Sequence, residues 1–222
     1  MTVVRTPLCW NAYWRVCVRA DGKAYIPLKI LIAGGFGVGK TTMVQALSEI
    51  PPLATEAALT TASVGLDDVT AVPDKTTTTV AMDFGRISMD ELVLYLFGTP
   101  GQDRFWFMWD ELARGCVGAV VLVDLRRVDD CFAAIDYFES RGLPFVLAVN
   151  TFPGTDVFPD DEVRDALALR PDTPVVRVDA RSADSCTAAL IRLVEHTLRR
   201  DGATPGPGRV GYRPLASAWG TG

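Results

Sequence analysis

The sequence predicts an α/β fold in which helices flank a mostly parallel central sheet. Short runs rich in Val, Leu and Ile alternate along the chain with segments of helical periodicity, a pattern typical of parallel strands that are buried on both faces. A glycine-rich segment at residues 34–41 fits G-x-x-x-x-G-K-S/T, the phosphate-binding P-loop. The 222 residues are enough for one domain with a full hydrophobic core. Together these observations predict a P-loop nucleotide-binding domain.

The P-loop motif lies between a predicted strand and a predicted helix, as its function requires. Residues 28–33 form a short apolar run typical of a buried strand, and apolar residues recur at helical spacing over 43–50 until two prolines follow. In such a loop the backbone N–H groups surround phosphate oxygens, Lys40 adds positive charge at the terminal phosphates, and the Thr41 hydroxyl can ligate Mg²⁺. A glycine-rich turn without a ligand is the alternative, which this context disfavours.

The later elements alternate in the same way. Strands are predicted at residues 79–87, 92–97, 118–124, 144–150 and 175–178, and helices at residues 128–141, 160–169 and 185–200. This order of strands and helices supports a single layered domain with no internal repeat.

Residues 1–27 and 201–222 differ from the middle of the chain. Apolar and polar residues alternate over 13–20 and a turn pair, Asp21-Gly22, follows, so the N-terminal extension forms either an added hairpin or a disordered leader. The C-terminal segment is rich in Gly and Pro without periodicity, which predicts a disordered tail. We therefore expect the P-loop domain to span residues 28–200.

Composition narrows the classes of function. The net charge of −5 argues against nonspecific nucleic-acid binding, so we expect no nucleic-acid partner. No apolar stretch approaches the length of a membrane span, and neither end carries a signal-peptide or lipidation pattern, which predicts no direct membrane anchor. The five scattered cysteines form no metal spacing and are typical of reduced thiols in a cytoplasmic protein.

Two loops follow the P-loop in an order that completes a phosphate site. Residues 53–78 show no clear period, and a loop this long inside a compact domain is usually functional or mobile. It ends in a run of threonines, one of which can complete the Mg²⁺ shell and sense a γ-phosphate, although a plain polar loop carries equal weight. After the strand at 92–97, Gly101 can offer its N–H to the γ-phosphate, and Gln102 can orient the attacking water.

The segments 33–42, 76–85 and 98–105 carry a resemblance to Ras-like small GTPases, in which the stretch corresponding to the third segment is D-T-A-G-Q-E-R-F. The chain looks closer still to the conservon-type GTPases of actinomycetes, relatives of the gliding-motility GTPase MglA. The likeness runs over about residues 28–199 and implies a Ras-like G domain. It also implies partners encoded nearby, a Roadblock-type protein and a sensor-kinase-like protein, which act with the GTPase at the membrane.

The resemblance also implies roles for individual residues. Thr79 takes the place of the magnesium ligand in switch I, Gln102 that of the water-positioning residue, and Asn150 that of the asparagine in the N-K-x-D base motif. The predicted metal ligands for Mg²⁺ are Thr41 and Thr79. The predicted nucleotide-binding residues are Gly34, Gly35, Phe36, Gly37, Val38, Gly39, Lys40, Thr41, Thr42, Gly101, Asn150, Ala180 and Arg181.

Two motifs depart from the pattern of the family that the chain resembles. Gly98 replaces the aspartate that supports Mg²⁺ through water. Asp124 is a candidate for a substitute carboxylate, but we favour its ordinary role as a residue at a strand end. The base motif lacks its lysine, and Pro153 stands where an aspartate would recognise guanine, with Asp156 nearby in sequence. Because hydrogen bonds supply most discrimination between purines, this change weakens the expectation of strict guanine selectivity.

The segment around the second loop also lacks expected features. Residues 53–79 contain no arginine, so a charge-stabilising arginine must come from Arg104, Arg126, Arg127 or a partner. The run at 105–109 contains five bulky apolar residues, which cannot all face one side of a helix. We favour a partner surface there, with helix core as the alternative.

The sequence as a whole predicts a small GTP-binding protein that acts as a signalling switch and hydrolyses GTP slowly, with help from a partner. Two alternatives remain open. One is a pseudo-GTPase scaffold with weak or no nucleotide binding, and the other is a P-loop protein with relaxed purine specificity that accepts ATP.

Overall fold

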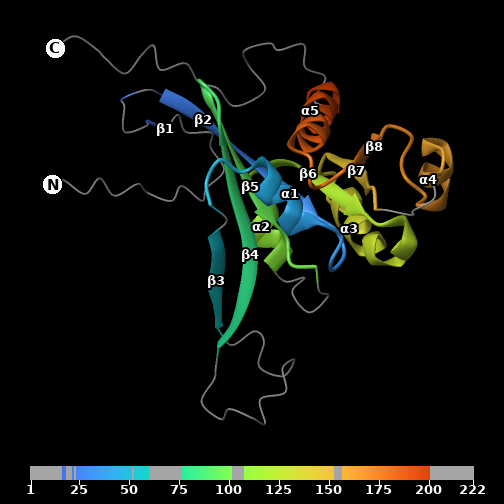
Figure 1. The fold of residues 1–222 in the computed structure, drawn as a ribbon, viewed down its shortest axis with the longest axis horizontal. Coiled ribbons are helices and arrows are strands. Elements are labelled where there is room, and N and C mark those ends of the chain that lie inside the picture. The colour runs from blue at the N-terminus through green and yellow to red at the C-terminus, as the bar shows by residue number, and fades with distance from the viewer. Residues whose placement is uncertain are drawn as a thin grey trace.

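The computed structural model describes residues 17–18, 22, 24–51, 53–60, 77–101, 108–152 and 157–200. Its core is a sheet with the strand order β3-β4-β5-β2-β6-β7-β8, and β1 pairs with the start of β2 (Figure 1). The strands are β1 Cys17–Val18, β2 Ala24–Ala33, β3 Leu53–Thr60, β4 Thr77–Ser88, β5 Leu92–Gly98, β6 Cys116–Val123, β7 Phe145–Asn150 and β8 Val175–Val178. Strands β5, β2, β6, β7 and β8 run parallel, whereas β1, β3 and β4 pair antiparallel with their neighbours.

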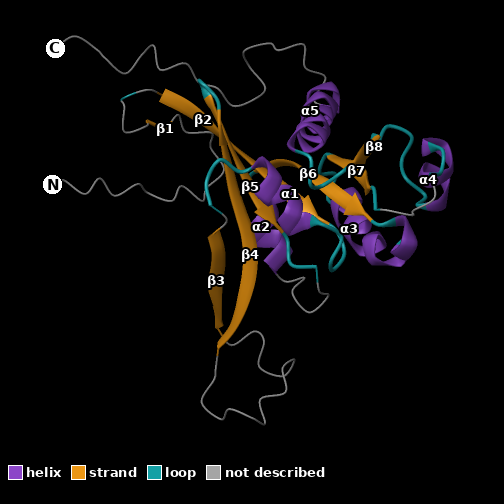
Figure 2. Ribbon diagram, in the orientation of Figure 1, coloured by secondary structure: helices purple, strands orange, loops and turns teal. Residues whose placement is uncertain are grey.

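Helices cover both faces of the sheet (Figure 2). They are α1 Lys40–Leu47, α2 Trp109–Ala113, α3 Asp129–Ser140, α4 Asp160–Ala166 and α5 Ala183–Arg200, with a short 3-10 helix, η3, at Leu125–Arg127. Alternate residues of β6 point to opposite layers: Val121 packs in the cluster with α2 and α3, and Val120 packs in the cluster with α1 and α5. The predicted α/β fold with a mostly parallel sheet is therefore confirmed.

The segment 53–60 corrects one prediction from the sequence. A long loop was expected from residue 53 to residue 78, but Leu53–Thr60 is a strand that pairs antiparallel with β4, from Leu53 opposite Phe84 to Thr60 opposite Thr77. Three of its eight residues are Ala and one is Glu, both of which have low strand propensity, so its local sequence gave little indication of a strand. Figure 1 shows β3 and β4 as a long hairpin at one edge of the sheet. Residues 61–76 lie outside the described part.

Helices α1 and α4 end earlier than predicted, α4 at Ala166 rather than at residue 169. Helix α1 ends at Leu47 rather than at residue 50, because Ser48 takes an extended conformation and its hydroxyl group donates to the carbonyl of Ile50. At the N-terminal side, the hairpin alternative agrees with the described residues, since Cys17 and Val18 pair with Tyr25 and Ala24. Residues 1–16 and 201–222 lie outside the described part of the chain, so the domain boundaries stay predictions.

The parallel strands direct their C-terminal ends to one edge of the sheet. Gly34, Asp124 and Asp179 each follow directly after a strand, and Asn150 is the last residue of β7. This edge is where α/β proteins of this kind bind ligands. None of the described helices is long and apolar enough to cross a bilayer.

Candidate nucleotide-binding site

The P-loop connects the C-terminal end of β2 to the first residue of α1. Gly39 has a φ of 110°, in the left-handed region, and a Cβ atom there would lie 2.7 Å from the Nδ2 atom of Asn150. Only glycine satisfies both conditions at this position. The conformation turns the chain directly into α1, whose first N–H groups have no partners within the helix and suit an anion.

Lys40 is buried on the inner side of this loop. Its ammonium group donates to the carbonyls of Gly34 at 2.8 Å and Gly35 at 2.6 Å, and the residue is 8% exposed. Burial lowers the pKa of Lys40 to about 8, although the negative charge of Asp83 acts in the opposite direction. Two of the three ammonium donors are thus used within the loop, and one is left for a phosphate oxygen.

The loop after β5 meets the P-loop at Lys40. A Cβ atom on Gly101 would lie 2.5 Å from the Nζ atom of Lys40 and 3.0 Å from the carbonyl oxygen of Gly35. A glycine is therefore needed for this close approach. The structure thereby brings together two of the segments that the sequence predicted to contact phosphate. Gln102 follows immediately but lies outside the described residues, so its catalytic role stays a prediction.

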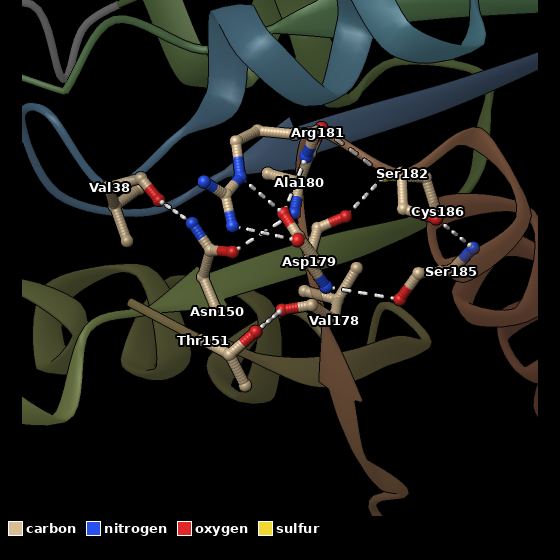
Figure 3. A network of polar contacts seen from close by, with 10 residues as sticks. All are labelled: Val38, Asn150, Thr151, Val178, Asp179, Ala180, Arg181, Ser182, Ser185 and Cys186. Carbon is tan, nitrogen blue, oxygen red and sulfur yellow. Dashed lines mark hydrogen bonds and ion pairs between the residues drawn. The ribbon is translucent and has the colours of Figure 1, made fainter. Parts of the chain in front are cut away.

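Asn150 is hydrogen-bonded to two other predicted site residues, Val38 and Ala180 (Figure 3). Its Nδ2 atom donates to the carbonyl of Val38 at 2.9 Å, and its Oδ1 atom accepts from the backbone N–H of Ala180 at 3.0 Å. The side chain is buried, with 5% of the residue exposed. In this structure Asn150 fixes the P-loop relative to the loops that follow β7 and β8.

The Arg181 side chain lies at the outer side of this network. It forms a two-point ion pair with Asp179, with both distances 2.9 Å, and Figure 3 shows the two side chains against each other. The bonds from Arg181 lower the pKa of Asp179 to about 2. The Arg181 side chain is exposed and that of Asp179 is partly buried, and the main effect of the pair is to hold the turn that presents Ala180.

Thr41, one of the two predicted magnesium ligands, is bonded to a carboxylate. The Thr41 hydroxyl group donates to Oδ2 of Asp83 at 2.6 Å. Thr79 lies in β4 opposite Ala58, four residues before Asp83, which is about 13 Å along a strand. The metal role of Thr79 stays a prediction. Sequence reasoning assigned no role to Asp83, although a carboxylate missing from one strand is a signal to search its neighbour.

Asp124, the weaker candidate for a metal-supporting carboxylate, is paired with Arg126. Its oxygens accept from the guanidinium group of Arg126 at 2.8 and 2.7 Å and from the Arg126 backbone N–H at 3.0 Å. These bonds cap η3 and hold the pKa of Asp124 below its usual value. Among the described residues, no three His, Cys, Asp or Glu side chains are grouped to hold a metal.

Two of the three arginine candidates can be placed. The Arg127 guanidinium group donates to the carbonyl of Phe36 in the P-loop at 2.8 Å. The Arg126 guanidinium group lies 4.0 Å from the centre of the Phe152 ring, two residues after Asn150 in the base motif. Arg104, Pro153 and Asp156 lie outside the described part of the chain.

The end of the aromatic run belongs to the core. Met108 and Trp109 are 9% and 3% exposed, and the Trp109 ring lies edge-on to that of Tyr137 with centroids 5.1 Å apart. The predicted partner surface is therefore wrong for these two residues, because their helix packs against α3 rather than facing solvent. Residues 105–107 are outside the description.

A separate hollow of about 640 Å³ lies away from the P-loop. It is lined by residues of α4, α5 and the segment before β8, among them Arg164, Asp172 and His196. None of its lining residues belongs to the P-loop network. We place the nucleotide site at the P-loop because the motif and its contacts converge there.

Residues 32–200 match the family described as "Conserved hypothetical ATP binding protein". The chain belongs to this family. A curated relative, an uncharacterized protein of Methanocaldococcus jannaschii, is 28% identical over 125 residues, which cover 55% of this chain and 69% of the relative.

Solved structures with a similar fold include three from FeoB proteins. The G domain of the T. maritima FeoB iron transporter has a TM-score of 0.51 and 17% identity, covering 78% of this chain and 98% of that one. The cytosolic domain of L. pneumophila FeoB has a TM-score of 0.53 and 14% identity, covering 74% of this chain and 69% of that one. The FeoB G domain from Methanococcus jannaschii has a TM-score of 0.51 and 14% identity, covering 77% and 97%. At these identities the likeness shows the fold, which is that of a P-loop G domain.

Proposed function

We propose that this chain binds a purine nucleoside di- or triphosphate together with Mg²⁺ and acts as a nucleotide-dependent switch of the small-GTPase type. The observation that carries the proposal is the meeting of Lys40, Gly35 and Gly101 at one point. A buried ammonium group, a helix N-terminus and the backbone of a second loop there face the space that a phosphate chain would take. When bound, Mg²⁺ would offset charge on the terminal phosphates, with the Thr41 hydroxyl group as one ligand.

The switch part of the proposal is supported by the position of Gly101. It connects β5 to a segment that leads into α2, so a γ-phosphate at Lys40 would touch the start of that segment. A loop held by a γ-phosphate and released after hydrolysis is the basis of GTPase switching. The proposal is that partners distinguish the two nucleotide states through this segment.

Hydrolysis by the isolated chain is proposed to be slow. Gln102 is the proposed water-positioning residue. Of the placed arginines, Arg126 is paired with Asp124, and Arg127 donates to the P-loop backbone. An arginine supplied by a partner speeds this class of reaction by on the order of 10³–10⁵. Single-turnover hydrolysis of labelled GTP and ATP should therefore be slow, and a fast rate lost in Arg127→Ala or Arg104→Ala would contradict the need for a partner.

We propose that the site discriminates only weakly between guanine and adenine. Asn150 is used to connect backbone groups, Thr151 stands in the place of the base-motif lysine, and Pro153 replaces the aspartate. Few side chains are then available to form hydrogen bonds to the edge of guanine, so GTP and ATP should compete more evenly than in an intact small GTPase. The description of the family as ATP-binding agrees with this proposal.

The cellular setting is proposed from the resemblance alone. A conservon-type GTPase would work in the cytoplasm with a Roadblock-type protein and a sensor-kinase-like protein, and these would recruit it to the membrane. The competing function is a pseudo-GTPase scaffold, which the altered base motif favours and the contacts at Lys40 oppose.

Mass identification of the nucleotide that co-purifies with the full chain tests the proposal against this competitor. We expect a purine nucleotide in near-stoichiometric amount, which is released by EDTA and is absent from Lys40→Ala. No co-purifying nucleotide, together with no binding of added GDP, GTP or ATP, would contradict nucleotide binding and favour the scaffold.

A further inference from the structure

A magnesium-dependent P-loop needs a carboxylate near its Ser or Thr hydroxyl group. In P-loop proteins Mg²⁺ is held by the P-loop Ser or Thr hydroxyl group and by an aspartate on a neighbouring strand. Strand β5 ends at Gly98, which has no side chain to offer. The described part of the chain therefore has either no such carboxylate or one from another element.

Asp83 occupies the space in front of Gly98. A Cβ atom built on Gly98 would lie 3.0 Å from both the Cβ and the Oδ2 atoms of Asp83, and 3.4 Å from its Cγ atom. The two strands are antiparallel neighbours, with Phe84 of β4 opposite Phe97 of β5. The carboxylate of Asp83 thus lies where a side chain from position 98 would begin, and glycine at 98 leaves room for it.

The same carboxylate faces the metal-binding side of the P-loop. Its Oδ2 atom accepts from the Thr41 hydroxyl group at 2.6 Å. Because a hydroxyl group has one hydrogen and two lone pairs, this bond leaves Thr41 Oγ1 lone pairs for a cation. Asp83 is also near enough to Lys40 for its charge to favour the ammonium form. A hydroxyl oxygen beside a carboxylate is a donor set that suits Mg²⁺, which takes few protein ligands along with phosphate and water.

We propose that Asp83, on β4, replaces the carboxylate that β5 lacks, so that Thr41 and Asp83 together hold the Mg²⁺ of the bound nucleotide. This inference rests on the proposed function. It assigns a role to a residue outside the P-loop and outside the loop after β5. It also explains why Gly98 and Asp83 occur together, since a side chain at 98 would collide with the carboxylate.

A purely structural role for Asp83 is the alternative to be separated. In that case the Thr41–Asp83 bond only ties α1 to β4, and its loss should affect the protein equally with and without Mg²⁺. The metal role predicts an effect that depends on Mg²⁺. The two can be separated by measuring nucleotide affinity in excess Mg²⁺ and in EDTA for each variant of the full chain.

The test is calorimetric titration with GDP and with ADP, so that base preference does not decide the result. Asp83→Asn keeps the size of the side chain and removes its charge. We expect it to lose roughly 10–100-fold in affinity in Mg²⁺, as for supporting groups at other metal sites, and to match the unchanged chain in EDTA. Asp90→Asn, at the exposed turn between β4 and β5, is the matched control and should change neither value.

A pair of substitutions that moves the carboxylate from β4 to β5 keeps the test decisive even if Asp83→Asn folds poorly. Asp83→Gly removes the carboxylate from β4, and Gly98→Asp returns one from β5 without the collision. The double variant should regain most of the Mg²⁺ dependence that Asp83→Gly loses, whereas Gly98→Asp alone should weaken binding by crowding Asp83.

Three results would overturn the inference. They are an equal loss of affinity in Mg²⁺ and EDTA for Asp83→Asn, an unaltered Mg²⁺ dependence in that variant, and an unchanged chain that binds nucleotide equally well in both media. In each of these the proposed nucleotide binding still stands. Failure of the unchanged chain to bind either nucleotide in either medium would instead overturn the proposed function, and this inference with it.

Discussion

At the phosphate end of the site Lys40 is 8% exposed and bonds to backbone carbonyls of its own loop, whereas at the base end the Arg181 side chain is 66% exposed and pairs with its neighbour Asp179. The phosphate end is built from backbone groups whose positions follow from a strand, a glycine loop and a helix. The base end depends on a few side chains in loops. A substitution such as proline at 153 can therefore alter base selectivity while the phosphate site and the fold remain intact.

Asn150 is the connection between these two ends. It donates to Val38 of the P-loop and accepts from Ala180 of the base loop. Its buried amide is used for connection within the protein, so this position of the base motif has a structural reason to be asparagine even where strict base recognition is lost. The comparison predicts that binding strength and base selectivity can be changed separately.

The largest expected effect is at Lys40. Lys40→Ala removes a buried charge-assisted donor to phosphate, so nucleotide affinity should fall by roughly 100-fold or more. Because burial of the ammonium group opposes folding, the melting temperature without nucleotide should not fall. Lys29→Ala, on the same strand–loop–helix unit but away from the loop, is the control that should bind normally. Unchanged affinity in Lys40→Ala would show that the phosphate end is elsewhere.

Asn150→Ala comes next, because it disturbs both ends at once. It leaves the Val38 carbonyl and the Ala180 N–H buried without their partner, which should lower the free energy of unfolding by about 2–3 kcal/mol. Nucleotide affinity should fall as the loop loosens. Chemical denaturation measures the change in stability, and calorimetry measures the change in affinity. A variant with normal stability would show that the network does not hold the P-loop.

The pH dependence of binding tests whether Lys40 contacts the bound phosphate. The pKa of Lys40 is lowered to about 8 by burial, and a bound phosphate would raise it again by favouring the ammonium form. Binding should then take up a proton above pH 8, so affinity should be flat below that pH and fall by up to about tenfold per unit above it. Titrations in buffers of different ionisation enthalpy measure the proton uptake. No uptake near pH 9 would contradict this position for Lys40.

The smallest expected effect is at the base end. Pro153→Asp returns a carboxylate to the position that recognises guanine, and one added hydrogen bond is worth about 0.5–1.5 kcal/mol, so the GDP-to-ADP affinity ratio should rise by roughly two- to tenfold. ADP affinity should hardly change, because the phosphate end is untouched. A fall in affinity for both nucleotides would mean that the loop cannot accept the change.

The sequence was sufficient where the structure depends on local pattern. The P-loop, the buried strands β6 and β7 and the place of Asn150 at a strand end were all predicted from short segments, and the fold is confirmed. Strand β3 was missed because its pairing with β4, not its own residues, makes it extended. The Asp83–Gly98 contact was missed for the same reason, since it depends on the register between two strands. Trp109 was misplaced because an aromatic run alone does not tell which members face a neighbouring helix.

Parallel calorimetric titration of Mg²⁺–GDP and Mg²⁺–ADP into the unchanged chain tests whether the phosphate end dominates binding. We expect both to bind, with affinities within about tenfold of each other, because the shared phosphate chain supplies most of the binding and few of the described groups distinguish the bases. A preference for GDP of several hundredfold would contradict it and would indicate that another group, such as Asp156, recognises guanine.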